Sequence, residues 1–212
     1  MRISTKSKQS YKLSHLLGGA FICAIVTACA HDAKPVEFYR LSADVGLKQN
    51  AKSAVNSKEV IVGLGPIRIP EYLNRPQIMV AISDNQYSIS EEHRWAENLD
   101  QNILLALYKV LPAQLNTDHV LRYPWSQRQD INYQVSIDIL DLTINPQGQS
   151  QFIAQWSIKV KEKANIDKRF ECSLPASRVD YALMVKVQSQ CLTQLGQAIS
   201  KSLNELMLFN MF

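Results

Sequence analysis

Residues 131–160 read INYQVSIDILDLTINPQGQSQFIAQWSIKV, and this stretch decides the class of fold. Apolar and polar residues alternate on both sides of Asn145-Pro146-Gln147-Gly148, which has the composition of a turn. The apolar positions are Ile131, Tyr133, Val135, Ile137 and Ile139, then Phe152, Ala154, Trp156, Ile158 and Val160. A period of two is typical of strands with one buried and one solvated face. The stretch therefore predicts a long antiparallel hairpin at the centre of a sheet.

A different spacing, with apolar residues at steps of three and four, predicts two helices that cover this sheet. The first runs from Leu99 to Leu111, and Pro112 should stop or kink it because proline lacks the backbone N–H. The second follows Ser177-Arg178-Val179-Asp180, a sequence close to a capping box, and reaches about Phe209. Cys191 lies on its apolar side.

The remaining segments predict shorter strands. Gly65-Pro66 should bend or bulge one of them, and Ser83-Asp84-Asn85 should join two others as a hairpin. Residues 42–58 show neither period and predict a loop. The expected strands cover 37–41, 60–70, 77–82, 86–89, 119–123 and 168–174. The order of elements predicts an α/β fold, a mixed β-sheet covered by two helices, forming a single domain over residues 37–212.

The N-terminus has the three parts of an export signal. Basic residues without an acid precede an apolar run, residues 16–26, that is about half of the ~20 residues needed to span a bilayer. The run ends in Val26-Thr27-Ala28-Cys29, which resembles the lipobox of bacterial lipoproteins. We expect residues 1–28 to be removed and Cys29 to carry a covalent lipid on a tether of residues 29–36. The alternative is ordinary secretory cleavage near Ala28 or Ala30, which leaves Cys29 a free thiol.

The charge of the chain changes once that signal is removed. Residues 1–28 hold four of the 23 basic residues and none of the 19 acidic ones, so the remainder carries 19 of each. A balanced charge gives no reason to expect nucleic acid as a partner. Ala30, in the place where aspartate usually means retention in the inner membrane, favours the outer membrane.

Cys172 and Cys191 remain after Cys23 leaves with the signal and Cys29 takes the lipid. An exported protein meets an oxidising compartment, so a disulfide between them is the simplest prediction. The alternative is two separately buried thiols that pack as small apolar side chains. Neither cysteine has the Cys-x-x-Cys or nearby His spacing of a metal site.

Catalytic motifs are absent from the sequence. It contains no Gly-x-Ser-x-Gly, His-Glu-x-x-His or phosphate loop, and no cofactor is expected besides the lipid on Cys29. His31 lies on the tether and His119 among strand residues. His93, within Glu91-Glu92-His93-Arg94-Trp95-Ala96-Glu97, could transfer a proton beside an acid, but charged residues at a helix start are more often dipole partners. We therefore expect a non-enzymatic protein.

Two stretches are more specific than these patterns. The first is Gly65-Pro66-Ile67-Arg68-Ile69-Pro70-Glu71-Tyr72-Leu73-Asn74-Arg75-Pro76-Gln77-Ile78, and the second is His93-Arg94-Trp95-Ala96-Glu97-Asn98-Leu99. Together they resemble the signature of the PqiC/YmbA family, auxiliary lipoproteins of ABC-type and MCE-type transport systems. Asn98 departs from the family, which often has proline there, and the pair Cys172 and Cys191 is not a feature associated with it.

The resemblance implies a fold like the TolB N-terminal or anticodon-binding type and a place on the periplasmic face of the outer membrane. It also implies PqiA-like and PqiB-like partners, a ring-shaped homo-oligomer, and a docking role in phospholipid transport between the two membranes. The alternatives are an accessory lipoprotein of another ABC transporter, a carrier that encloses a lipid in an apolar cavity, and, third, a cell-envelope hydrolase.

The candidate partner-binding residues come from the two motifs: Pro70, Tyr72, Leu73, Arg75, His93, Arg94 and Trp95. Tyr, Trp and Arg are enriched at binding hot spots, and Pro70 with Pro76 should stiffen the loop. The alternative is that Arg75 and Arg94 pair with local carboxylates and that Trp95 plugs the sheet edge.

Overall fold

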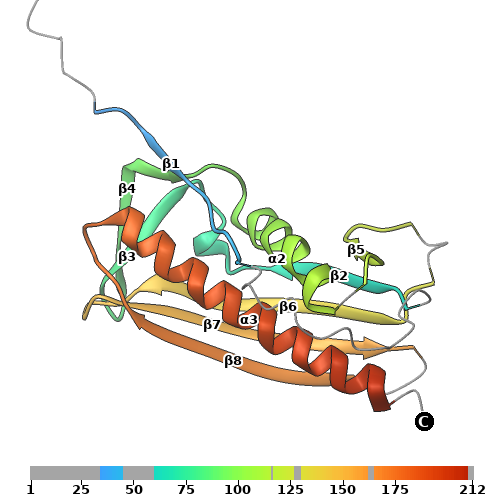
Figure 1. Ribbon diagram of the computed structural model, residues 1–212. Helices are drawn as coiled ribbons and strands as arrows, with labels where there is room; N and C mark the ends of the chain where they lie inside the picture. Colours follow the sequence, from blue (N-terminus) through green and yellow to red (C-terminus); the bar gives the residue numbers. More distant parts are fainter. Residues whose placement is uncertain (1–33, 45–59, 116, 127–129, 162–164, 210–212) are drawn as a thin grey trace, which may run out of the picture. The chain divides into compact units, whose positions relative to one another are not determined.

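The hairpin expected from the alternating pattern is present in the computed structural model as β6 (Tyr133–Ile144) and β7 (Gln149–Val160) (Figure 1). The two strands pair antiparallel, with Ile137 opposite Trp156. The side chain of Asn145 closes the turn, because its Oδ1 accepts hydrogen bonds from the backbone N–H groups of Gln147 and Gln149. The structure describes residues 34–44, 60–115, 117–126, 130–161 and 165–209. The expected signal, Cys29, and most of the expected loop over residues 42–58 lie outside these ranges.

Five strands form the larger sheet, in the order β5-β2-β6-β7-β8. The three added strands are β2 (Val62–Arg68), β5 (Val120–Arg122) and β8 (Ile166–Pro175). β2 runs parallel to both β5 and β6, and its register with β6 shifts between Leu64 and Ile67, where the sequence predicts a bend. Gly65 there has φ +117°, and a Cβ on it would lie 2.6 Å from Cβ of Tyr123, so only glycine fits.

A second sheet has three strands in the order β1-β4-β3, namely β1 (Glu37–Tyr39), β4 (Gln86–Trp95) and β3 (Gln77–Ser83). The mixed α/β fold with two covering helices is confirmed, but its strands are divided between two sheets. The prediction that this strand of the hairpin ends at Ile89, with the charged residues around His93 at a helix start, was wrong. β4 continues to Trp95 because β1 pairs with it in parallel, with Tyr39 opposite Trp95.

Two helices pack on the larger sheet, α2 (Leu99–Leu115) on β2 and β5, and α3 (Tyr181–Phe209) on β6, β7 and β8 (Figure 1). Pro112 does not stop α2, which continues for three residues beyond it. The carbonyl that loses its donor belongs to Tyr108 on the exposed side of the helix, where water can satisfy it. Asp180 rather than Ser177 caps α3, because its Oδ1 accepts the backbone N–H of Leu183 at 2.9 Å.

No helix in the described part of the chain combines the length and the apolar character that crossing a membrane requires. The residues from Val36 to Phe212 form one unit.

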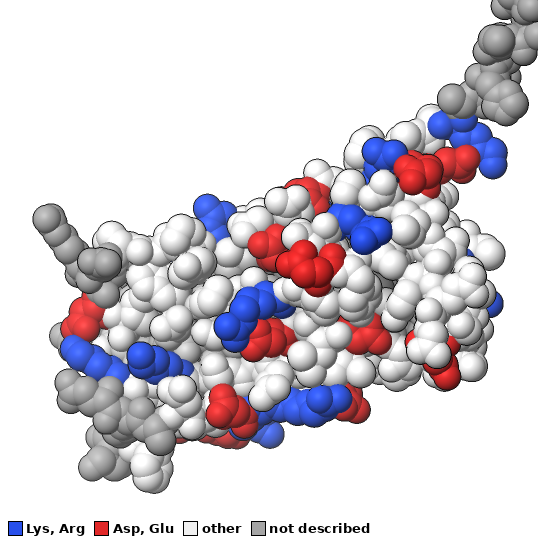
Figure 2. Space-filling view, turned by 180° about the vertical axis from the view of Figure 1, so that it is seen from behind, with Lys and Arg blue, Asp and Glu red and all other residues white. Residues whose placement is uncertain are grey.

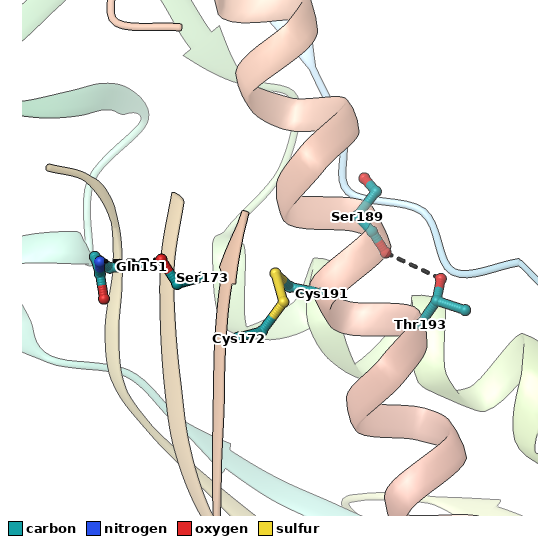
Figure 3. The surroundings of a disulfide bond; sticks show 6 residues. All are labelled: Gln151, Cys172, Ser173, Ser189, Cys191 and Thr193. Carbon is teal, nitrogen blue, oxygen red and sulfur yellow. Dashed lines mark hydrogen bonds between the residues drawn. A yellow bond between two sulfur atoms is a disulfide. The ribbon is translucent and has the colours of Figure 1, made fainter. Parts of the chain in front are cut away.

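A disulfide joins Cys172 of β8 to Cys191 of α3, with 5.7 Å between the two Cα atoms. Figure 3 shows the sulfur atoms between the edge strand and the helix. Both cysteines are buried. The same helix holds the segment after β1, because Ser189 Oγ and Thr193 Oγ1 accept the backbone N–H groups of Ser42 and Asp44 at 3.1 and 3.0 Å.

Candidate partner-binding surface

The two motif stretches meet in the three-stranded sheet. The backbone N–H of Trp95 donates to the carbonyl of Pro76 at 2.6 Å, and Gln77 pairs with Arg94 across β3 and β4. On the other side of β4, the N–H of Ala96 donates to the carbonyl of Tyr39 at 2.8 Å. The motifs are therefore neighbours in space, and the structure shows which of their side chains face inward.

Three of the seven candidate residues maintain the fold. Pro70 precedes the 3-10 helix η3 (Glu71–Leu73), and its carbonyl accepts the N–H of Leu73 at 3.0 Å. The side chains of Leu73 and Trp95 are buried in the core. Trp95 is therefore a core residue, which is closer to the alternative that it plugs the sheet edge than to a contact with a partner.

Tyr72 takes part in an aromatic pair that the sequence did not reveal. Its ring stacks on Tyr87 of β4 with 5.5 Å between centroids, and its hydroxyl donates to Asp141 Oδ1 at 3.1 Å. Burial, followed by the negative charge of Asp141, raises the pKa of both tyrosines above the ordinary value. Both hydroxyls therefore remain protonated. That of Tyr72 donates to Asp141, and that of Tyr87 can donate to a ligand or partner.

The exposed members of this group form a small surface. Tyr87 is 37% exposed, and Ile89 lies two residues further along β4 on the same face and is also exposed. We call Tyr72, Tyr87 and Ile89 the Tyr72–Tyr87 surface. Partly exposed aromatic side chains held by a second ring and a carboxylate lose little conformational freedom on binding.

The two motif arginines differ in their surroundings. Arg94 donates to the carboxylate of Glu91 at 3.0 Å and to its backbone carbonyl at 3.1 Å. This matches the alternative that Arg94 pairs with a local carboxylate. Arg75 is exposed, and no carboxylate of the described residues pairs with it. Arg75 therefore has a guanidinium group available for an acceptor on another molecule.

His93 lies in a cluster that joins three elements. Its Nδ1 is 3.0 Å from the hydroxyl of Tyr39 and 3.4 Å from Glu37 Oε2, and its ring stacks on Tyr181 of α3 at 3.9 Å. The Tyr39 hydroxyl also donates to Glu37. Burial, then this hydrogen bond and the charge of Glu37, raise the pKa of Tyr39 to about 12. The cluster ties β1 and β4 to the first turn of α3.

Asn102 has a structural role that was not predicted from the sequence. Its buried amide accepts the N–H of Leu41 at 2.7 Å and donates to the carbonyl of Leu41 at 3.2 Å and to Glu97 at 2.9 Å. The sequence did contain an indication of this role, because Asn102 is a polar residue on the apolar side of α2, three residues after Leu99. It satisfies the backbone where the chain leaves β1.

Charge does not mark a site among the residues that the structure describes. Figure 2 shows basic and acidic side chains interspersed over one face, and Arg68–Asp138 and Arg169–Glu171 are ion pairs on the sheet. Among the described residues no group of His, Cys, Asp and Glu could hold a metal ion. The surface chemistry thus suits contacts with a protein better than binding of a polyanion.

The fold of the described residues is a mixed α/β domain of two sheets and two helices, with some of the motif residues exposed. The family model of the ABC-type transport auxiliary lipoprotein component matches residues 39–200. The chain belongs to this family, which confirms the resemblance to PqiC/YmbA proteins. The description of the family names its members as auxiliary components of transport and as lipoproteins.

Two solved structures show the same fold. A protein described as uncharacterized is 20% identical, with a TM-score of 0.65 over 80% of this chain and 99% of its own. A Xanthomonas campestris protein of the family DUF330 is 14% identical, with a TM-score of 0.64 over 78% of this chain and 93% of its own. No curated protein matches the chain.

Proposed function

We propose that this chain is an outer-membrane lipoprotein that docks a PqiB-like MCE protein, and with it a PqiA-like membrane protein, for phospholipid transport between the two membranes. The family supports the transport role, and Val26-Thr27-Ala28-Cys29 supports a lipid anchor at Cys29. Ala30 supports the outer membrane. In this proposal the protein acts without catalysis and assembles as a homo-oligomeric ring.

The observation that carries the docking role is the Tyr72–Tyr87 surface. The first motif contributes Tyr72 from η3 and Arg75 from the segment after it. The Tyr72 ring stacks on the exposed ring of Tyr87, and no carboxylate of the described residues pairs with Arg75. Tyr and Arg are the residue types that most often carry binding energy. Of the other candidate residues, Leu73 and Trp95 are buried, and His93 and Arg94 are paired within the chain.

One groove in the described part of the chain bears on the carrier alternative. The structure contains a groove of about 230 Å³ between β8 and α3, lined by Trp156, Phe170 and Ala198 together with charged residues. Pockets that hold small molecules usually enclose roughly 300–1,000 Å³. This groove is therefore small for a phospholipid with two acyl chains.

The test is co-purification of the full-length protein from membranes in mild detergent, with identification of what accompanies it. We expect an MCE-domain protein with the unsubstituted chain and about tenfold less of it with Tyr87→Ala or Arg75→Ala. Tyr108→Ala is the matched control, because Tyr108 on α2 is also 37% exposed. Circular dichroism checks that each variant is folded.

Three other results would count against the docking role. Stoichiometric lipid without a protein supports the carrier, and a transporter without an MCE domain supports the accessory alternative. Equal recovery with Tyr87→Ala and Tyr108→Ala means that the partner binds elsewhere.

A further inference from the structure

Exposed apolar side chains gather at the end of the domain where the chain enters β1. Phe38 is 65% exposed and Val179, just before α3, is 87% exposed; Val36 and Leu183 are exposed as well. Large apolar groups that are exposed at one end of a domain are costly in water and usually mark a contact surface. We call these four residues the β1 end.

The two segments of the β1 end are far apart in sequence but are held together by the His93 cluster. Glu37 is the register partner of His93 in the parallel pair of β1 and β4. The ring of His93 stacks on Tyr181, which lies between Val179 and Leu183. Because Glu37 and Tyr39 point toward this cluster, Phe38 between them points to the opposite side of the strand.

Charged groups of both signs lie at the β1 end. The side chains of Glu37, Asp180, Arg40 and Arg178 are all exposed, and Arg178 donates to the carbonyl of Pro146 at 3.5 Å. Exposed apolar side chains among exposed charged groups match the boundary between the headgroups and the acyl chains of a bilayer.

Exposed apolar residues also occur at the other end of α3, where Phe209 is 80% exposed, so exposure alone does not select an end. The length of the segment between Cys29 and the domain does select one end. Residues 30–36 separate Cys29 from the domain and extend over at most about 25 Å. Phe209 lies about 39 Å along α3 from Leu183, at ~1.5 Å per residue. A lipid on Cys29 therefore keeps the β1 end near the membrane and places no such limit on Phe209.

We propose that the β1 end seats on the phospholipid bilayer, with Phe38, Val36, Val179 and Leu183 at the boundary between headgroups and acyl chains. This inference rests on the lipid anchor at Cys29 in the proposed function. It adds a second, non-covalent contact, which orients the domain in addition to retaining it.

The experiment uses the full lipidated chain in vesicles of phosphatidylethanolamine and phosphatidylglycerol with brominated acyl chains, which quench tryptophan near the hydrocarbon. The added emission of Phe38→Trp is measured against the unsubstituted protein, and Phe209→Trp is the control at the far end of α3. We expect the added emission of Phe38→Trp to fall about twofold or more on brominated vesicles, while that of Phe209→Trp does not change.

Two outcomes overturn the inference, and they are distinguishable. If the unsubstituted protein does not sediment with the vesicles, the anchor itself fails and the proposed function fails with it. If the protein sediments but Phe38→Trp is quenched no more than Phe209→Trp, the anchor stands and the seating of the β1 end is wrong.

Discussion

The backbone N–H of Trp95 donates a hydrogen bond of 2.6 Å to the carbonyl of Pro76, and this bond joins the two motifs of the family. Gln77 also pairs with Arg94, so the two motifs meet at one end of the three-stranded sheet. Part of the signature is thus a requirement of folding, and only its exposed residues are free to bind. The two roles predict different effects of mutation.

Trp95→Ala should lower the free energy of unfolding by about 3–5 kcal/mol, because it removes a large buried side chain and leaves a cavity. Arg75→Ala, at an exposed position of the other motif, should change it by less than about 0.5 kcal/mol. Urea denaturation of both variants measures the difference. Equal losses would mean that Arg75 also maintains the fold.

Asn102→Leu should cost about 1–3 kcal/mol although the two side chains are similar in size, because the buried N–H of Leu41 loses its acceptor. Hydrogen exchange at the Leu41 amide should become faster in the same variant. Gln101→Leu, an exposed neighbour on α2, is the control and should leave both quantities unchanged. Unchanged exchange at Leu41 in Asn102→Leu would contradict this role.

The double variant Cys172→Ala/Cys191→Ala should be about 3 kcal/mol less stable than the oxidised protein. The bond closes a loop between residues 19 apart, and the estimate comes from the chain entropy that the open loop regains on unfolding. Urea denaturation with and without reductant gives the comparison. A variant as stable as the oxidised protein would show that the disulfide contributes nothing to stability.

Alkaline pH should destabilise the protein through Tyr39. Its pKa is raised to about 12 in the folded state, against about 10 in the unfolded chain, so the folded state favours the neutral hydroxyl. This contribution is complete below pH 10 and is lost as the pH rises to about 12. Tyr39→Phe should therefore show a flatter dependence of unfolding free energy on pH in this window. Identical pH dependence of the unfolding free energy in the two proteins would contradict this role of Tyr39.

Much of the fold could be predicted because its strongest patterns are local. Alternation identified β6 and β7, and three-four spacing identified α3 almost to its last residue. What was missed depends on pairing between distant segments. β4 extends to Trp95 only because β1, about 55 residues earlier in the chain, lies beside it, and no local period carries that information. The division into two sheets has the same cause.

The candidate site was predicted in outline only. The motif identified Tyr72 and Arg75, but Tyr87 lies in a hairpin whose sequence gives no sign of a contact with Tyr72. His93 was placed at a helix start, whereas its neighbours Tyr39 and Tyr181 come from opposite ends of the domain sequence. Side-chain partners of this kind follow from the topology, which the sequence patterns did not determine.

Site-specific photo-crosslinking in cells tests the docking role most directly. A photoreactive phenylalanine derivative replaces Tyr87 in the full-length protein, and in a second strain it replaces Tyr108, which is equally exposed on α2. We expect a crosslinked product that contains an MCE-domain protein from position 87 and none from position 108. Absence of that product at position 87 in a correctly anchored protein, or the same product from both positions, would contradict a docking surface built on Tyr72 and Tyr87.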